Sequence, residues 1–237
     1  MQYCYTYGDI AQTLTPLPDD IIVNEYPTGL KFETWGLTDS IGVAQSVDIA
    51  IVGNEIYMKD LDDYTSGCVV KGYIEGDKVT FPSMQFFGVH EEFNDFLFFH
   101  GCTYGMRWFE DFQDYYEGYS IAKNIVMGYD PVARKLTASS ATGFIMNSRF
   151  DDVNYFSAFL KPEIFSQSDE MLIGAPENPE FTIYERIDYY EQDRIIWMLP
   201  NTNTNGAFID VNRVYYNVYV NDELYTFTPD LYPYVQD

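Results

Sequence analysis

The chain is poor in basic residues, cysteine and histidine. Its 237 residues include 13 Lys and Arg against 37 Asp and Glu, which gives a net charge of −24 at pH 7. A surface of this charge repels polyphosphates, so the composition argues against a nucleic-acid partner. Three cysteines, Cys4, Cys68 and Cys102, are too few for a disulfide framework and match no zinc spacing. Two histidines and the absence of a Gly-x-Ser-x-Gly motif argue against a nucleophilic triad.

Long hydrophobic runs are also missing. No apolar segment approaches the length that spans a bilayer, so no transmembrane segment is expected. No signal peptide is recognisable at the start of the sequence. These features by themselves fit either a cytosolic protein or the processed part of an exported one.

Residues 47–88 contain the clearest structural pattern. They form at least four short runs of alternating apolar and polar side chains, the first of them from Val47 to Ile51. Gly53-Asn54 then supplies the two positive-φ positions of a tight hairpin turn, and Gly76-Asp77 marks a second turn. Such strands have one apolar face and one wet face. The segment therefore predicts an antiparallel up-and-down meander in an all-β protein.

Aromatic residues are abundant, with 22 Tyr and 18 Phe. Half-buried strands favour these residues, and so do sites that stack on flat ligands. In the densest stretch, residues 107–119, Trp108, Phe112, Tyr115 and Tyr119 recur every three or four positions. This spacing predicts a short amphipathic helix, or an aromatic loop, that covers one end of a barrel.

Strand patterns continue beyond this stretch and stop at a Pro- and Gly-containing boundary, residues 173–179. Residues 1–174 are therefore predicted to form a lipocalin-like antiparallel β domain, a barrel or sandwich with one short helical cover. Residues 175–237 contain about four further strand patterns, whereas an immunoglobulin-like or fibronectin-like sandwich needs about seven. They are predicted to form a partial module of that kind, incomplete at its C-terminus.

Two groups of segments carry a resemblance. IYMKDL and VKGYIEGDKVTFP in residues 56–82, followed by VYYNVYVNDELYTFTPDLY in residues 214–232, resemble a group of uncharacterised exported proteins of gut commensal anaerobes. In that group a lipocalin-like β-meander precedes an immunoglobulin-like module. The resemblance implies an extracellular or cell-envelope location. It implies no catalytic residues, because its motifs encode hairpins and not chemistry.

Two segments contain residue types that bind metals. The first includes His90, Glu91, Glu92, His100 and Cys102, but their spacing matches no known zinc motif. The second is the NTNTNG run at residues 201–206, which resembles a calcium loop in its alternation and its glycine. Its ligand positions are neutral amides, and Asn212 stands where a carboxylate is needed, so a polar loop between strands is expected. Neither a metal site nor a cofactor is predicted.

The aromatic and acidic residues of residues 107–119 are the best candidates for a site. Aromatic ring faces stack on sugar rings, and carboxylates accept hydrogen bonds from sugar hydroxyls. The alternative is that these aromatic side chains belong to the core. The predicted ligand-binding residues are Trp108, Tyr115, Tyr116, Tyr119, Glu110 and Asp114.

The leading functional hypothesis is a non-catalytic, exported cell-surface binding or adhesion protein whose ligand is a glycan or a small amphiphile. One alternative is a carbohydrate-active hydrolase. Such an enzyme needs two carboxyl groups about 5 to 9 Å apart, and Glu110 with Asp114 would be neighbours on a helix. Another alternative is a structural spacer that holds a functional domain away from the membrane.

Overall fold

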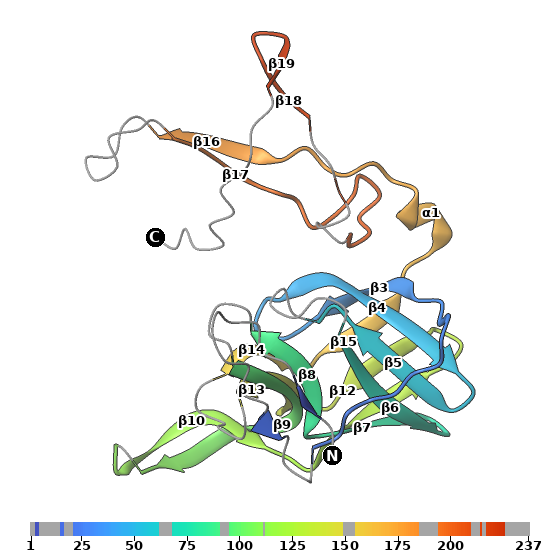
Figure 1. The fold of residues 1–237 in the computed structure, drawn as a ribbon, viewed down its shortest axis with the longest axis vertical. Coiled ribbons are helices and arrows are strands. Elements are labelled where there is room, and N and C mark those ends of the chain that lie inside the picture. The colour runs from blue at the N-terminus through green and yellow to red at the C-terminus, as the bar shows by residue number, and fades with distance from the viewer. Residues whose placement is uncertain are drawn as a thin grey trace.

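The computed structural model describes residues 21–61, 68–90, 95–110, 112–148, 155–184, 194–209, 214 and 217–225, together with the short strands at residues 3–4 and 15–16. Antiparallel strands account for almost all regular structure in these ranges (Figure 1). The predicted all-β fold, with a lipocalin-like meander and a further β-module, is confirmed.

Eight strands close into a barrel in the order β11-β12-β15-β3-β4-β5-β6-β7. Their bounds are β3 Glu33–Thr38, β4 Ala44–Val52, β5 Glu55–Lys59, β6 Val69–Glu75, β7 Lys78–Pro82, β11 Asn124–Asp130, β12 Lys135–Ala138 and β15 Glu163–Ser166.

Strands β3 to β7 are neighbours in both sequence and space, as the alternating pattern predicted. The turn between β4 and β5 differs from the prediction in one respect. Gly53 has a φ of 63°, but Asn54 does not have a positive φ. A single positive φ at the first turn position is the pattern of a type II′ turn, in which glycine takes the only left-handed position.

A second antiparallel sheet is formed by strands that leave the barrel between β7 and β11 and between β12 and β15. Strand β9 lies at its centre and pairs with β8, β10 and β13, while β14 pairs with β13. The bounds are β8 Gln85–His90, β9 Asp95–Phe109, β10 Asp114–Ile121, β13 Thr142–Ser148 and β14 Tyr155–Leu160.

One hydrophobic core joins the barrel to the second sheet. Inward-facing side chains of the barrel, such as Val70 and Phe81, belong to the same buried cluster as Phe99, Phe144 and Phe159 of the second sheet. The rings follow one another in contact, with centroids 6.2 Å apart for Phe81 and Phe99, and 5.4 Å apart for Phe99 and Phe144. Burial of this aromatic series holds the two sheets together.

The segment before β3 covers part of the outer barrel surface. Leu30 and Phe32 pack on a small outer cluster that contains the fully buried Tyr57. The Asn24 side-chain amide donates to the side-chain oxygen of the buried Gln85 at 2.5 Å. The same Gln85 oxygen accepts the Lys71 backbone N–H at 2.7 Å, so this amide ties the covering segment to β6 and β8.

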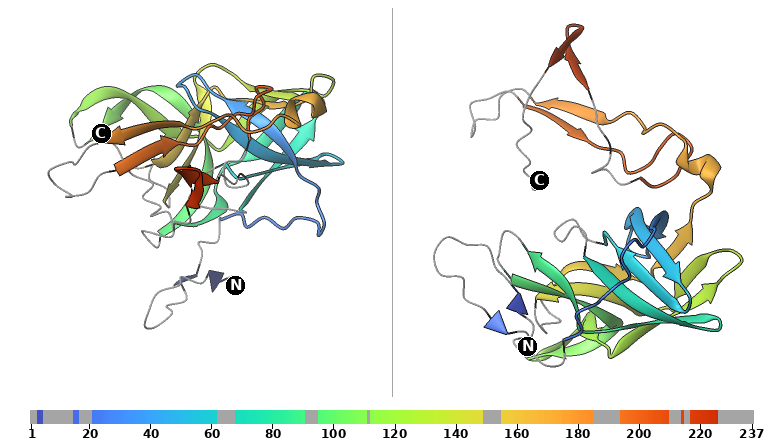
Figure 2. Two further views of the ribbon diagram at one scale, coloured as in Figure 1. Left: turned by 90° about the horizontal axis from the view of Figure 1, so that it is seen from above. Right: turned by 45° about the vertical axis from the view of Figure 1, so that its right-hand side comes forward.

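In the described ranges, the remaining elements form three two-stranded sheets and one helix. β16 to β19 lie to one side of the barrel beyond α1, in orange and red in Figure 1 and in the right panel of Figure 2. This part of the chain shows two hairpins, whereas residues 226–237 lie outside the described ranges, so the extent of the predicted immunoglobulin-like module stays a prediction. The bounds are β1 Tyr3–Cys4, β2 Thr15–Pro16, α1 Asp169–Leu172, β16 Glu180–Tyr184, β17 Arg194–Met198, β18 Val218–Val220 and β19 Glu223–Tyr225.

Polar contacts attach the loop after β17 to the barrel, and this region of contact is here called the joint. The Gln167 side chain accepts the Phe208 backbone N–H at 2.5 Å and donates to the Phe208 carbonyl at 3.0 Å. The Phe208 ring packs on Phe165, with centroids 6.2 Å apart, and a Cβ atom on Gly36 would collide with both rings. The glycine therefore provides the space in which this loop rests on β3.

Candidate functional site

Residues 107–119 form a β-hairpin and not a helix. Strand β10 pairs with β9 in a register that places Tyr115 opposite Trp108 and Tyr119 opposite Tyr104. The spacing of three to four residues arises because the aromatic side chains lie on both sides of a tight turn. The predicted helical cover is therefore wrong here, and cross-strand aromatic pairing accounts for the pattern. In Figure 1 the hairpin extends beyond the barrel.

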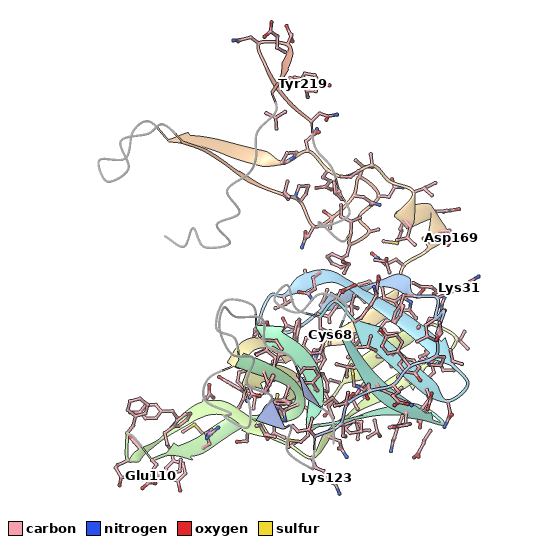
Figure 3. All side chains as sticks on the ribbon, viewed as in Figure 1. Lys31, Cys68, Glu110, Lys123, Asp169 and Tyr219 are labelled. Atoms are coloured by element: carbon pink, nitrogen blue, oxygen red, sulfur yellow. The ribbon has the colours of Figure 1, made fainter. Side chains whose placement is uncertain are left out.

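The turn of this hairpin is set by Glu110 and Gln113. The Gln113 backbone N–H donates to the Glu110 carbonyl at 3.3 Å, and Gln113 has a φ of 50°. Its side-chain amide donates to the same carbonyl at 2.8 Å and to Glu110 Oε1 at 3.1 Å. The chain thereby reverses at the tip, where Figure 3 labels Glu110.

One face of the hairpin, here called the Trp108 face, contains Tyr104, Met106, Trp108, Tyr115, Glu117 and Tyr119. At its outer end the Trp108 and Tyr115 rings meet edge to face, with centroids 5.2 Å apart and an angle of 67° between their planes. Trp108 is 42% exposed and Tyr115 is 58% exposed. The two rings stabilise each other while leaving much of their surface open to solvent.

Glu110 completes the outer end of the Trp108 face. The Trp108 indole Nε1 donates to Glu110 Oε2 at 2.7 Å. This hydrogen bond, followed by the one from Gln113, lowers the pKa of the Glu110 carboxyl because both donors stabilise the charged form. Glu110 is therefore a persistent anion beside an exposed indole. A glycosidase acid needs the opposite shift, a raised pKa, so Glu110 does not fit the role of proton donor in the hydrolase alternative.

The opposite face, here called the Phe109 face, contains Arg107, Phe109 and Tyr116, with Phe112 from the turn. The Arg107 guanidinium lies 4.7 Å from the centre of the Phe109 ring. The Phe109 and Tyr116 centroids are 6.0 Å apart, and those of Phe112 and Tyr116 are 5.6 Å apart. The only positive charge described on the hairpin therefore lies on the Phe109 face, held by an aromatic ring.

The base of the hairpin is buried. Tyr119 is 6% exposed and belongs to a cluster with Cys102 and Ile145. Its ring contacts Tyr104 with centroids 5.0 Å apart, and its carbonyl accepts a hydrogen bond from Arg107. Tyr119 thus fixes the hairpin to the second sheet, as the core alternative proposed, and is not available for stacking.

The structure divides the six predicted residues among three places. Trp108, Tyr115 and Glu110 come together at the tip, and Tyr119 is buried at the base. Tyr116 lies on the Phe109 face. Asp114 is opposite Phe109, and its carboxylate accepts the Tyr115 backbone N–H at 2.7 Å. Asp114 and Glu110 are therefore not neighbours on a helix face.

Glu117, one of the acidic residues interleaved with the aromatic ones, shares the Trp108 face with Met106, which sequence reasoning missed. They are a cross-strand pair, and the Tyr104 hydroxyl donates to the Glu117 carboxylate at 3.4 Å. The alternation of Tyr104, Met106 and Trp108 has the period of a strand and could have predicted that these side chains share one face.

The candidate zinc ligands occupy β8, β9 and the segment between them. His100 and Cys102 are buried in β9, while Glu91 and Glu92 lie outside the described residues. Within the described ranges, no three His, Cys, Asp or Glu side chains are grouped closely enough to hold a metal ion. Burial raises the pKa of the Cys102 thiol to about 12.

The NTNTNG run forms a self-contained polar loop. The Asn203 side-chain oxygen accepts the backbone N–H groups of Asn205 and Ala207, at 3.0 and 2.9 Å. Its amide nitrogen donates to the Met171 carbonyl at 2.6 Å, and the residue is fully buried. The oxygen that a calcium loop would aim at the ion is therefore used by the loop itself, as expected for a structural turn.

Comparisons with protein-family models, with curated proteins and with solved structures found no match. Among the helices of the described residues, none has the length and apolar character to cross a membrane. The resemblance to exported proteins of gut anaerobes therefore stays a prediction from the sequence.

Proposed function

We propose that this chain is a non-catalytic, exported cell-surface binding or adhesion protein whose ligand is a glycan or a small amphiphile. The observation that carries the proposal is the exposure of Trp108 and Tyr115 at the end of a projecting hairpin. Exposed large aromatic side chains in one patch are typical of binding surfaces. The cell-surface location rests on the resemblance described above.

The fold supports a binding role on the hairpin and not inside the barrel. The inward side chains of the described barrel strands pack into a continuous core, which leaves recognition to the surface. The hairpin is well suited to this role because its base is buried through Tyr119 while its tip is exposed. A rigid base limits the conformational entropy that the tip loses when it binds.

A glycan array followed by isothermal titration calorimetry tests the proposal. The Trp108→Ala/Tyr115→Ala double variant removes both ring faces and should lose binding. Tyr219→Ala is the matched control, because Tyr219 is 61% exposed and lies on β18, at the opposite end of the molecule in Figure 3. Unchanged binding by the double variant, or no binding to any saccharide or amphiphile by the native protein, would refute the proposal.

A role as a structural spacer is favoured by one separate observation, the joint between the barrel and the second module. Gln167 and Phe208 connect them through two hydrogen bonds, and Asn203 is fully buried beside α1. Small-angle X-ray scattering of the native protein and of Gln167→Ala would measure whether this joint fixes the distance between the modules. A spacer requires the native protein to be the more rigid of the two.

A further inference from the structure

We infer that the Trp108 face recognises an organic cation, specifically a methylated ammonium group carried by a small soluble molecule. This inference rests on the proposed binding function and names the chemical class of its ligand.

The Trp108 and Tyr115 rings form a corner. Their planes meet at 67° with centroids 5.2 Å apart, so a compact group placed in the corner contacts two aromatic surfaces at once. Aromatic faces carry negative electrostatic potential and attract cations within about 6 Å. Sites for quaternary ammonium groups commonly combine several such rings.

The charges around the corner have one sign. Glu110 lies at its outer end through the Trp108 hydrogen bond, and Glu117 lies further down the same face. The pKa of Glu110 is held below its ordinary value, so this carboxylate stays charged at neutral pH. Arg107, the basic residue of the described hairpin, is directed to the Phe109 face.

The net charge of the whole chain adds to the negative electrostatic potential of the Trp108 face. A net charge of −24 raises the concentration of cations near the surface and repels anions. An anionic ligand on the Trp108 face would meet two carboxylates and no described cation. Charge complementarity therefore favours a cationic occupant.

The aromatic surface of the corner favours a methylated cation over a primary amine. Each oxygen of Glu110 accepts one hydrogen bond, from Trp108 at 2.7 Å or from Gln113 at 3.1 Å, and the faces of the two rings offer no strong acceptor for an N–H group. A primary ammonium group brings three N–H donors that must be satisfied when they lose water. A trimethylammonium group has no donor and needs only aromatic surface and a negative field, which are the features of this corner.

Choline chloride is a suitable probe, and 3,3-dimethylbutan-1-ol is its neutral isostere, with a tert-butyl group in place of the trimethylammonium group. The Trp108 indole N–H is the reporter, because its resonance in a proton–nitrogen correlation spectrum is sensitive to contacts at the corner. Choline should shift this resonance with a dissociation constant on the order of 1 mM, as expected for an exposed site. The isostere should bind roughly fivefold more weakly, the factor that one exposed cation–π contact contributes.

Three variants test whether choline binds at the Trp108 face. Tyr115→Leu keeps apolar area but removes one ring face, and Glu117→Gln removes one charge from the same face. Both should weaken the choline response, whereas Tyr219→Ala should leave it unchanged. Equal binding of choline and its isostere, no shift with choline, or an unchanged response in Tyr115→Leu would overturn the inference. Cosedimentation with phosphatidylcholine vesicles without any response to free choline would also overturn it, because the ligand would then be a membrane surface.

The choline experiment can fail without refuting the proposed binding function. If the double variant Trp108→Ala/Tyr115→Ala abolishes binding to a glycan or neutral amphiphile while choline produces no shift in the native protein, the proposed function stands and the cation inference fails. If choline binds as described, the inference and a binding role for the hairpin are both supported.

Discussion

Gly101 of β9 passes Ile125 of β11 so closely that a Cβ atom on Gly101 would lie 2.5 Å from the Ile125 backbone nitrogen. The contact is reinforced by Ser83, whose hydroxyl donates to the Ala122 carbonyl at 2.6 Å and accepts the Gly101 backbone N–H at 2.8 Å. The strand that forms the aromatic hairpin is thus attached to the barrel at its midpoint. The position of the candidate site depends on this crossing.

Gly101→Ala should therefore destabilise the protein. The added methyl group meets backbone atoms that belong to a closed barrel and cannot move aside easily, so we expect a loss of about 3 kcal/mol in the free energy of unfolding. Chemical denaturation followed by circular dichroism measures this loss. Gly105→Ala in the same strand is the control, because a Cβ atom there meets nothing within 4 Å. Equal stability of the two variants would contradict the role of the crossing.

Asn203→Ala should destabilise the joint. The substitution leaves the Ala207 backbone N–H, now bonded to Asn203 at 2.9 Å, without its acceptor in a buried position. A buried group that loses its partner costs about 1 to 3 kcal/mol, which thermal unfolding detects. Asn205→Ala is the control, since Asn205 is exposed and its side chain makes one bond, to Glu170.

Calcium should not stabilise this loop, because the Asn203 side-chain oxygen already accepts two backbone N–H groups. The melting temperature should be the same with millimolar calcium as with a chelator. A rise in melting temperature that depends on Asn203 would show that the loop binds the ion.

The Glu110 carboxyl should titrate below its ordinary pKa, and the Trp108 indole N–H resonance should move with the same midpoint. The indole hydrogen bond is the largest cause of the lowered pKa and the Gln113 amide is the second. Trp108→Phe should therefore raise the pKa of Glu110 more than Gln113→Ala does. Carbon-detected NMR titration of the carboxyl between about pH 2 and 7 covers its ordinary value. The opposite order of the two variants would contradict the geometry of the tip.

The thiols of Cys68 and Cys102 should differ in reactivity. Cys68 is partly exposed, whereas Cys102 is buried and its pKa is raised to about 12 by desolvation. Only the thiolate reacts with disulfide reagents. In a Cys4→Ser background, Cys68 should react first and Cys102 only as the protein unfolds. Reaction of both thiols at one rate under native conditions would contradict this assignment.

The same pKa predicts a change in stability at high pH. Folded Cys102 keeps its proton up to about pH 12, whereas in the unfolded chain the thiol ionises near 9.0. The folded state then binds more protons between these values, so its stability falls as the pH rises from about 9 towards 12. Cys102→Ala should show a smaller loss of stability over this range. Parallel curves for the two proteins would contradict the burial of an ionisable group.

The strands of the meander were predictable because each strand and turn is specified by residues that are close together in the sequence. The alternation around Val47 and the glycines at Gly53 and Gly76 determine which residues face inward and where the chain turns. The structure places Val47 in the core and gives both glycines a positive φ. The aromatic segment was harder, because a tight hairpin places residues three and seven positions apart on one face much as a helix does. Propensity alone does not separate the two structures in a short segment.

The sequence by itself determined the all-β character of this protein, its antiparallel meander and its excess of negative charge, since alternation, turn residues and composition are local or additive properties. Only the tertiary structure decided that Trp108, Tyr115 and Glu110 meet while Tyr119 is buried and Arg107 is turned away. Such placement depends on strand register and on the crossing of β9 over β11. The register of β9 and β10 is set by the tight turn between them, whose residue spacing resembles that of a helix. The crossing joins segments that are separated in the sequence, and packing of the whole core selects it.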